Sequence, residues 1–179
     1  MKNISRVLVL IAVTGIMACS GAEQVATNSS VTPKDSVYPV WYSGFEFNSD
    51  STSFTARATS VSSESVTAKK RAEIEARVLL ESYIADELED IRTELERDGS
   101  STVKEAGFIL MLRNAHLRIE EAASIVQSES VEKEGTHRGF AKAQITKVEV
   151  DDLLRKGFSS NSSYWRAFSG ARSYQDFLK

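Results

Sequence analysis

Few residues in this 179-residue chain have the type and spacing that chemistry requires. It has one cysteine, Cys19, and two histidines, His116 and His137. A single cysteine forms neither an intramolecular disulfide nor a cysteine-based zinc cluster. Neither histidine has a second histidine three or four residues away, so we expect packing or surface roles for both and no metal site. Candidate chemistry therefore begins with Cys19.

The remaining polar groups do not form a catalytic pattern. The carboxylates of Glu120–Glu121 and Asp151–Asp152 are adjacent in sequence, and neighbouring side chains point apart on a helix or strand, which makes them poor acid–base couples. The chain contains no G-x-S-x-G, G-x-G-x-x-G or Walker phosphate loop. We therefore predict a non-enzymatic protein with no catalytic residues and no cofactor.

Cys19 stands at the end of a segment typical of secretory signals. Lys2 and Arg6 precede the apolar run 7–18, and its twelve residues are fewer than the roughly 20 that a membrane-spanning helix needs. The sequence Ile16-Met17-Ala18-Cys19 resembles the lipobox of bacterial lipoproteins. This resemblance implies cleavage between Ala18 and Cys19 and lipidation of the Cys19 thiol. The alternative is an ordinary signal peptide with a chance cysteine.

The resemblance also bears on localisation, because Asp after the lipidated cysteine favours retention in the inner membrane. Ser20 therefore favours a bacterial outer-membrane protein that is lipid-anchored and faces the periplasm. The net charge is −3, and removal of Lys2 and Arg6 makes it −5, which gives no electrostatic case for nucleic-acid binding. An acidic domain beside acidic lipid is expected to be a tethered domain that is held by its lipid and not by electrostatic adhesion.

The length and composition predict one folded domain behind a tether. Hydrophobic residues make up 41% of the chain and charged residues 26%, as in ordinary globular proteins. We assign residues 1–18 to the signal peptide, 19–39 to the lipidated cysteine and a flexible tether, and 40–179 to a single domain. An ordered N-terminal arm packed on the domain is the alternative to the tether.

The domain shows strand and helix patterns in a fixed order. Alternation predicts a hairpin from 41–47 and 54–61, and apolar spacing of three and four predicts a helix at 63–98 that Ser62 or Ser63 caps and Gly99 ends. The later segments are a helix at 101–114, strands at 122–133 and 137–150, a helix beginning at Asp151, a flexible run at 159–163 and an aromatic tail at 164–179. This order predicts an α+β, two-layer sandwich: a long helix packed on a small antiparallel sheet, with extra short helices.

The long helix exceeds what one sheet face covers, since about 36 residues span roughly 50 Å. Its C-terminal half either packs on the next segment or projects toward a partner. The aromatic tail either folds back on the core, which we favour, or docks on a partner. If the two segments contact a partner, the candidate surface comprises Leu88, Ile91, Leu95, Trp165 and Phe168.

Three stretches together resemble the LPP-twenty family of bacterial envelope lipoproteins. They are the strand 54–60, the alanine-punctuated helix segment 64–80 and the late strand 139–145. The helix signature comprises Ala68, Ala72, Ala76, Arg77, Leu79 and Leu80. The resemblance implies a long helix against a small antiparallel sheet, and some relatives look like flagellar accessory lipoproteins, so a link to motility rests on it alone.

These observations favour a lipid-anchored outer-membrane scaffold or assembly factor that self-associates or binds an envelope protein. The alternative is a monomeric periplasmic carrier that binds a small or lipid-like ligand between helix and sheet. A third hypothesis, a hydrolase of envelope material, needs a polar cleft that the sequence does not indicate. The apolar stretch from Leu79 to Leu95 distinguishes the scaffold from the carrier. In a scaffold this stretch would form contacts between subunits, and in a carrier it would line the ligand cavity.

Overall fold

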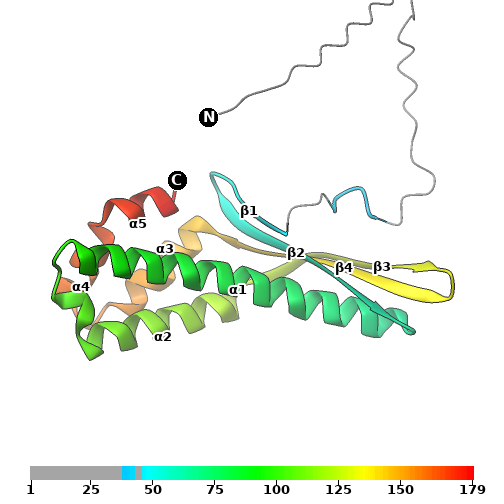
Figure 1. Cartoon of the computed structure of the whole chain (residues 1–179), viewed down its shortest axis with the longest axis horizontal. Helices are drawn as coiled ribbons and strands as arrows, with labels where there is room; N and C mark the ends of the chain where they lie inside the picture. The colour runs from blue at the N-terminus through cyan, green and yellow to red at the C-terminus, as the bar shows by residue number, and fades with distance from the viewer. Residues whose placement is uncertain (1–37, 43–45) are drawn as a thin grey trace, which may run out of the picture. The chain divides into compact units, whose positions relative to one another are not determined.

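The computed structural model describes residues 38–42 and 46–179, and these form a four-stranded antiparallel sheet with helices (Figure 1). The strands lie in the order β1-β2-β4-β3, with bounds β1 Phe47–Ser49, β2 Ser53–Ser62, β3 Ser124–Lys133 and β4 Thr136–Thr146. The helices are α1 Ser65–Arg97, the 3-10 helix η1 Thr102–Lys104, α2 Ala106–Ala122, α3 Lys147–Gly157, α4 Ser162–Ser169 and α5 Arg172–Phe177. The predicted α+β fold, a long helix packed on a small antiparallel sheet with extra short helices, is confirmed.

The first hairpin turns at Asp50. Its carboxylate accepts hydrogen bonds from the backbone N–H groups of Thr52, at 2.7 Å, and Ser53, at 2.8 Å. These bonds, those of Thr52 first, lower the pKa of Asp50 to about 2. The hairpin is present as predicted, but its first strand begins only at Phe47. The predicted strand 41–47 is wrong at 41 and 42, because residues 38–42 form a turn in which Tyr42 N–H donates to the Pro39 carbonyl, and residues 43–45 lie outside the described part of the chain.

The long helix α1 matches the predicted 63–98 within two residues at each end. Its predicted cap is wrong: the N-cap residue is Glu64, which makes no side-chain capping bond, and the Ser62 hydroxyl accepts from the Glu64 backbone N–H at 3.3 Å. Gly99 follows the helix end at φ +90°, as a C-terminal glycine should.

The N-terminal half of α1 lies directly on the sheet. Ala68, Ala72 and Ala76 repeat every four residues on the buried side, and all three are fully buried. A Cβ added to Gly139 in β4 would lie 2.2 Å from the backbone oxygen of Ala68. Helix and strand therefore meet at the backbone, and only small residues fit between them.

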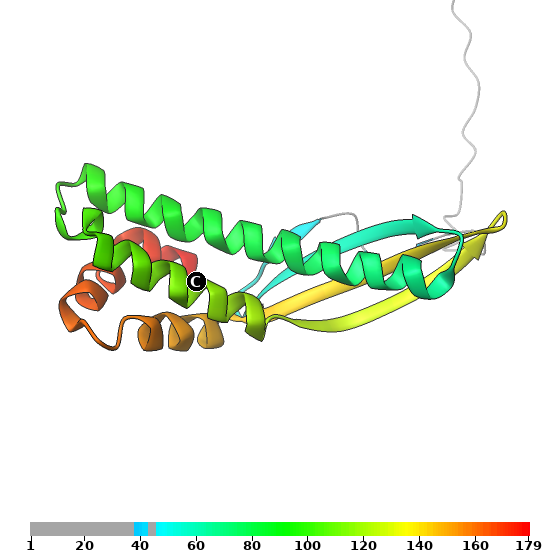
Figure 2. The same ribbon diagram turned by 90° about the horizontal axis from the view of Figure 1, so that it is seen from below.

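The C-terminal half of α1 extends past the sheet, where α2 lies alongside it (Figure 2). The predicted second helix is present but spans Ala106–Ala122 rather than 101–114. Aromatic rings from α2, the end of α3, and α4 fill this end: Phe108 lies 5.2 Å from Phe158 and 5.9 Å from Phe168, measured between ring centroids. The aromatic tail folds back on the core, as we favoured.

The late strand and the segments after it begin and end at different places from those predicted. The strand predicted at 137–150 stops at Thr146, and α3 begins at Lys147 rather than at Asp151. The Thr146 hydroxyl accepts a hydrogen bond from Glu149 N–H at 3.1 Å, so it caps the helix. The prediction of a flexible run at 159–163 is also wrong, because α4 begins at Ser162. The Asn161 side chain caps this helix by accepting a hydrogen bond from the Ser163 N–H at 3.1 Å.

The second hairpin is built as predicted. Strand β3 spans Ser124–Lys133, against the predicted 122–133, and pairs with β4 along its length apart from a bulge between Ile125 and Gln127. Glu134 and Gly135 form the turn with φ of +53° and +75°. Positive φ at both central residues is the conformation that matches the twist of a two-residue hairpin.

Candidate functional site

The predicted lipidation site lies outside the described residues. Neither Ala18 nor Cys19 is among residues 38–42 and 46–179, so the structure places neither. Within those ranges, no helix is long and apolar enough to cross a lipid bilayer.

The residues of the predicted partner surface lie in the hydrophobic core or pack against it. Leu88 and Ile91 are 2% exposed and Phe168 is fully buried, while Leu95 and Trp165 are half-buried and pack on the same cluster. The apolar stripe of α1 continues past the sheet, and the chain's own later helices cover it there. All five lie where the C-terminal half of α1 packs with the later helices.

A small groove between α1 and α2 gathers apolar and charged side chains. It encloses about 160 Å³. Its lining includes the apolar residues Ala85, Leu88, Ile109 and Leu112 and the charged or polar residues Glu89, Arg92, Arg113 and His116. The Nε2 atom of His116 is buried there and makes no hydrogen bond.

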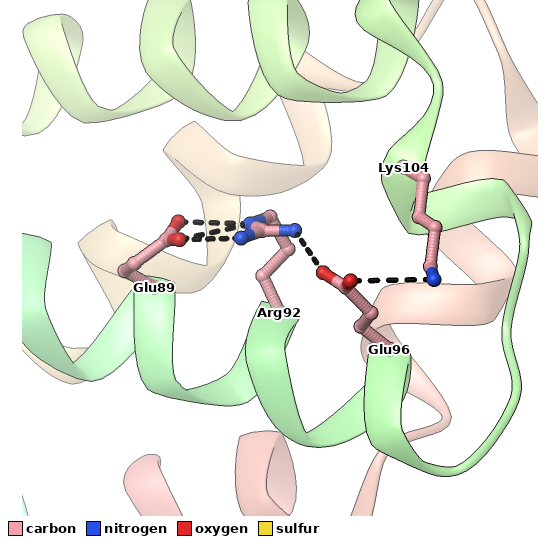
Figure 3. A network of polar contacts seen from close by, with 4 residues as sticks. All are labelled: Glu89, Arg92, Glu96 and Lys104. Atoms are coloured by element: carbon pink, nitrogen blue, oxygen red, sulfur yellow. Dashed lines mark hydrogen bonds and ion pairs between the residues drawn. The ribbon is translucent and has the colours of Figure 1, made fainter.

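Arg92 dominates the polar side of this groove, and two acids hold it (Figure 3). Its guanidinium lies 2.6 Å from a Glu89 carboxylate oxygen and 3.0 Å from one of Glu96, and Lys104 approaches Glu96 at 3.3 Å. The hydrogen bonds to Glu89 contribute most to raising the pKa of Arg92. The hydrogen bond from Arg92 contributes most to lowering the pKa of Glu96. Both partners of Arg92 are carboxylates of its own helix, so Arg92 stabilises α1, while the Glu96–Lys104 pair joins α1 to η1.

The other polar residues singled out by the sequence serve the fold. Asp151 in α3 accepts a hydrogen bond from the Tyr174 hydroxyl at 2.6 Å and pairs with Arg155 at 2.6 Å. Burial, and then the bond to Asp151, raise the pKa of Tyr174 above its usual range. His116 lies in α2 and His137 in β4, and no group of three or more His, Cys, Asp or Glu side chains in the described part of the chain could hold a metal ion.

A contact that the sequence pattern does not predict lies on the outer face of the sheet, the face opposite α1. Residues 38–42, which we name the clasp, lie over Phe140 of β4. The Phe140 ring centroid is 5.5 Å from that of Tyr38 and 5.0 Å from that of Tyr42, and Phe140 is buried. Tyr38 lies within the predicted tether, residues 19–39, so the ordered domain begins at least two residues before the predicted boundary at 40. The concentration of aromatic residues in 41–47 is the feature of the sequence that could have indicated this contact.

Polar contacts join the clasp to two strands. The Trp41 indole N–H donates to a Glu129 carboxylate oxygen of β3, and the Arg138 guanidinium of β4 donates to the Tyr38 hydroxyl at 2.9 Å. The same guanidinium lies 5.6 Å from the Tyr38 ring centroid, within cation–π range. Burial contributes most to raising the pKa of Tyr42. The clasp is therefore fixed by ring stacking, hydrogen bonding and charge together.

Comparisons of the chain with protein-family models, with curated proteins and with solved structures find no match.

Proposed function

We propose that this protein is a lipid-anchored lipoprotein of the bacterial outer membrane that faces the periplasm and acts as a non-enzymatic scaffold or assembly factor. The observation that carries the proposal is the position of the only cysteine, Cys19, directly after a short apolar run and a small residue. The LPP-twenty resemblance supports the same envelope setting, and a role in motility is a further extension of it.

The packing of α1 supports a rigid scaffold over the carrier alternative. A carrier needs space between helix and sheet, and along the N-terminal half of α1 the backbone of Ala68 meets Gly139 while Ala72 and Ala76 are fully buried. Opening that layer would expose the small-residue contacts that hold the domain together. A scaffold needs no such space and acts through its surface.

The anchor is tested by its chemistry. Cys19→Ser should abolish incorporation of labelled fatty acid, and the mass of the wild-type mature protein should match an acylated cysteine at its N-terminus. Because Cys19 is the only cysteine, no other thiol can take its place. Persistent labelling in the variant would overturn the lipoprotein proposal.

Sorting gives a second test with a matched control. Ser20→Asp should move the protein into the inner-membrane fraction, whereas Ser20→Ala should leave it in the outer membrane. Equal distribution of the two variants would count against outer-membrane sorting by this residue.

The scaffold role is tested by the assembly state of the mature protein. Light scattering after size exclusion should give a discrete oligomer, or crosslinking in cells should give a defined complex with an envelope protein. A monomer that carries a small or lipid-like molecule in native mass spectrometry would support the carrier instead.

A further inference from the structure

The clasp and the outer face of the sheet form one surface beside the point where the described chain begins. The register places Arg57 and Val61 of β2 and Lys142 of β4 on the same face as Phe140, under or beside the clasp. Val40 projects fully into solvent, and Tyr38 and Val61 are also exposed. A hollow of about 390 Å³ lies between Tyr38, Val61, Arg138 and the β3–β4 turn.

The residue types on this surface suit a lipid–water interface. Tyrosine and tryptophan combine an apolar ring with a polar tip and are enriched at the head-group level of membranes. Tyr38 and Trp41 supply such rings, and the exposed valines Val40 and Val61 supply aliphatic contact. Lysine and arginine can lay their stems on apolar surface while the charged group reaches lipid phosphates.

Charge is distributed unevenly along the domain. The N-terminal half of α1, residues 65–81, carries three acidic and four basic residues, whereas residues 82–97, which extend past the sheet, carry six acidic and two basic residues. On the outer face, the cations Arg57, Arg138 and Lys142 stand beside two carboxylates: Glu129, which is bonded to Trp41, and Glu46, which lies beside Arg57 and Tyr42. An anionic lipid surface therefore repels the acidic C-terminal half of α1 more than it repels the outer face, although the whole chain is acidic.

The proposed lipid anchor at Cys19 would bring this face close to the membrane. Cys19 precedes the clasp by 19 residues, and a flexible segment of that length has a mean reach of roughly 25 Å. Because the clasp is bonded to the outer face, the predicted tether joins the domain on that side. The outer face is consequently the part of the domain that meets lipid most often.

We propose that the clasp and the outer face of the sheet dock on an anionic phospholipid surface, so that α1 faces away from the membrane. This inference rests on the proposed lipid anchor. It adds a second, weaker contact that orients the domain.

The two tryptophans allow a direct test with the acylated mature protein in vesicles of phosphatidylethanolamine and phosphatidylglycerol. Trp165→Phe leaves Trp41 in the clasp as the only tryptophan, and Trp41→Phe leaves Trp165 in α4 as the matched control. Lipids brominated near the head group should quench Trp41 strongly and Trp165 weakly. Equal quenching of the two would overturn the docking.

A pair of charge reversals separates docking from general electrostatics. Lys142→Glu and Lys70→Glu change the net charge equally, but Lys142 lies on the outer face and Lys70 is exposed on α1. Quenching of Trp41 should fall about twofold in Lys142→Glu and stay unchanged in Lys70→Glu. Equal loss in both variants would overturn the assignment of this face.

The mass of the purified protein keeps the two proposals distinguishable. An acylated protein whose Trp41 is not quenched overturns the docking and leaves the anchor intact. A mature protein without acyl chains overturns the anchor and the docking that rests on it.

Discussion

Replacing Gly139 with alanine tests whether α1 and β4 truly meet at the backbone. The added Cβ would lie 2.2 Å from the Ala68 oxygen, and reaching even 3.0 Å requires helix and strand to separate by about 0.8 Å. A gap of that size forfeits a quarter to a half of the dispersion energy of the atoms it separates. Together with overpacking in a buried layer, this should lower the free energy of unfolding by about 3 kcal/mol.

Urea denaturation followed by circular dichroism measures the effect. With a slope of about 2 kcal/mol/M, the midpoint should fall by about 1.5 M. Ala68→Gly should not rescue the variant, because the clash involves the carbonyl and not the Ala68 side chain. Gly157→Ala is the contrasting case: its Cβ would lie 2.5 Å from the Ala115 Cβ, so Ala115→Gly should restore part of the loss.

A loss of less than about 1 kcal/mol in the free energy of unfolding of Gly139→Ala would contradict the backbone contact. Restoration of that variant's stability by Ala68→Gly would contradict it as well. Either result would mean that α1 lies farther from β4 than the backbone contact requires.

Three further predictions concern the core, a turn and a buried hydroxyl. Leu88→Ala should cost about 2–5 kcal/mol in urea unfolding, whereas Leu110→Ala, at an exposed α2 position, should stay within about 0.5 kcal/mol of wild type. Asp50→Ala should destabilise the protein at neutral pH. Because the folded pKa of Asp50 is about 2, below its ordinary 3.8, the difference from wild type should be complete above pH 3.8 and disappear as the pH falls toward 2; a difference independent of pH would contradict this. Tyr174→Phe should cost about 1.5–3 kcal/mol, because it leaves the Asp151 carboxylate without its hydroxyl partner, and unchanged thermal stability would argue against that bond.

Local pattern was enough to predict the long helix and the second hairpin. The spacing of Ala68, Ala72 and Ala76 specifies a helix with one narrow apolar face, whatever it packs on. Glu134-Gly135 sits between two alternating strands and adopts the turn that such a pair requires. Neither element depends on contacts distant in sequence.

The end of β4 could not be predicted in this way. The residues after Ile145 continue to alternate, so the pattern alone favours a longer strand. In the sheet, Thr146 pairs with Ser53, the first residue of β2, and only the Lys147 N–H still bonds beyond it, to the Thr52 carbonyl in the turn of the first hairpin, so a longer β4 would run past the end of β2. The Thr146 hydroxyl then caps α3, and the boundary is set jointly by strand pairing and capping.

Dependence on contacts with other segments also explains why the surroundings of the candidate partner residues and of Trp41 could not be predicted. The apolar stripe through Leu88 and Ile91 shows that these residues will be covered, but it does not show by what: α2 is the next helix, whereas α4 and α5 come from a distant part of the chain. The segment around Trp41 alternates like a strand, yet Phe140 and Glu129 draw it onto the outer face. In both cases, contacts with other segments of the chain determine where the residues pack, and the local pattern alone does not distinguish the alternatives.

The burial of the predicted partner surface and the proposed docking together restrict where a scaffold partner can bind. Contact cannot use Leu88 or Ile91 without opening the core, and the outer face of the sheet would be occupied by lipid. The helices α1 and α2 lie on the other side, with exposed apolar side chains at Ile74, Val78 and Leu110. A domain oriented by its clasp would hold these residues toward the periplasm, so a partner of the anchored protein should be sought on the α1–α2 side.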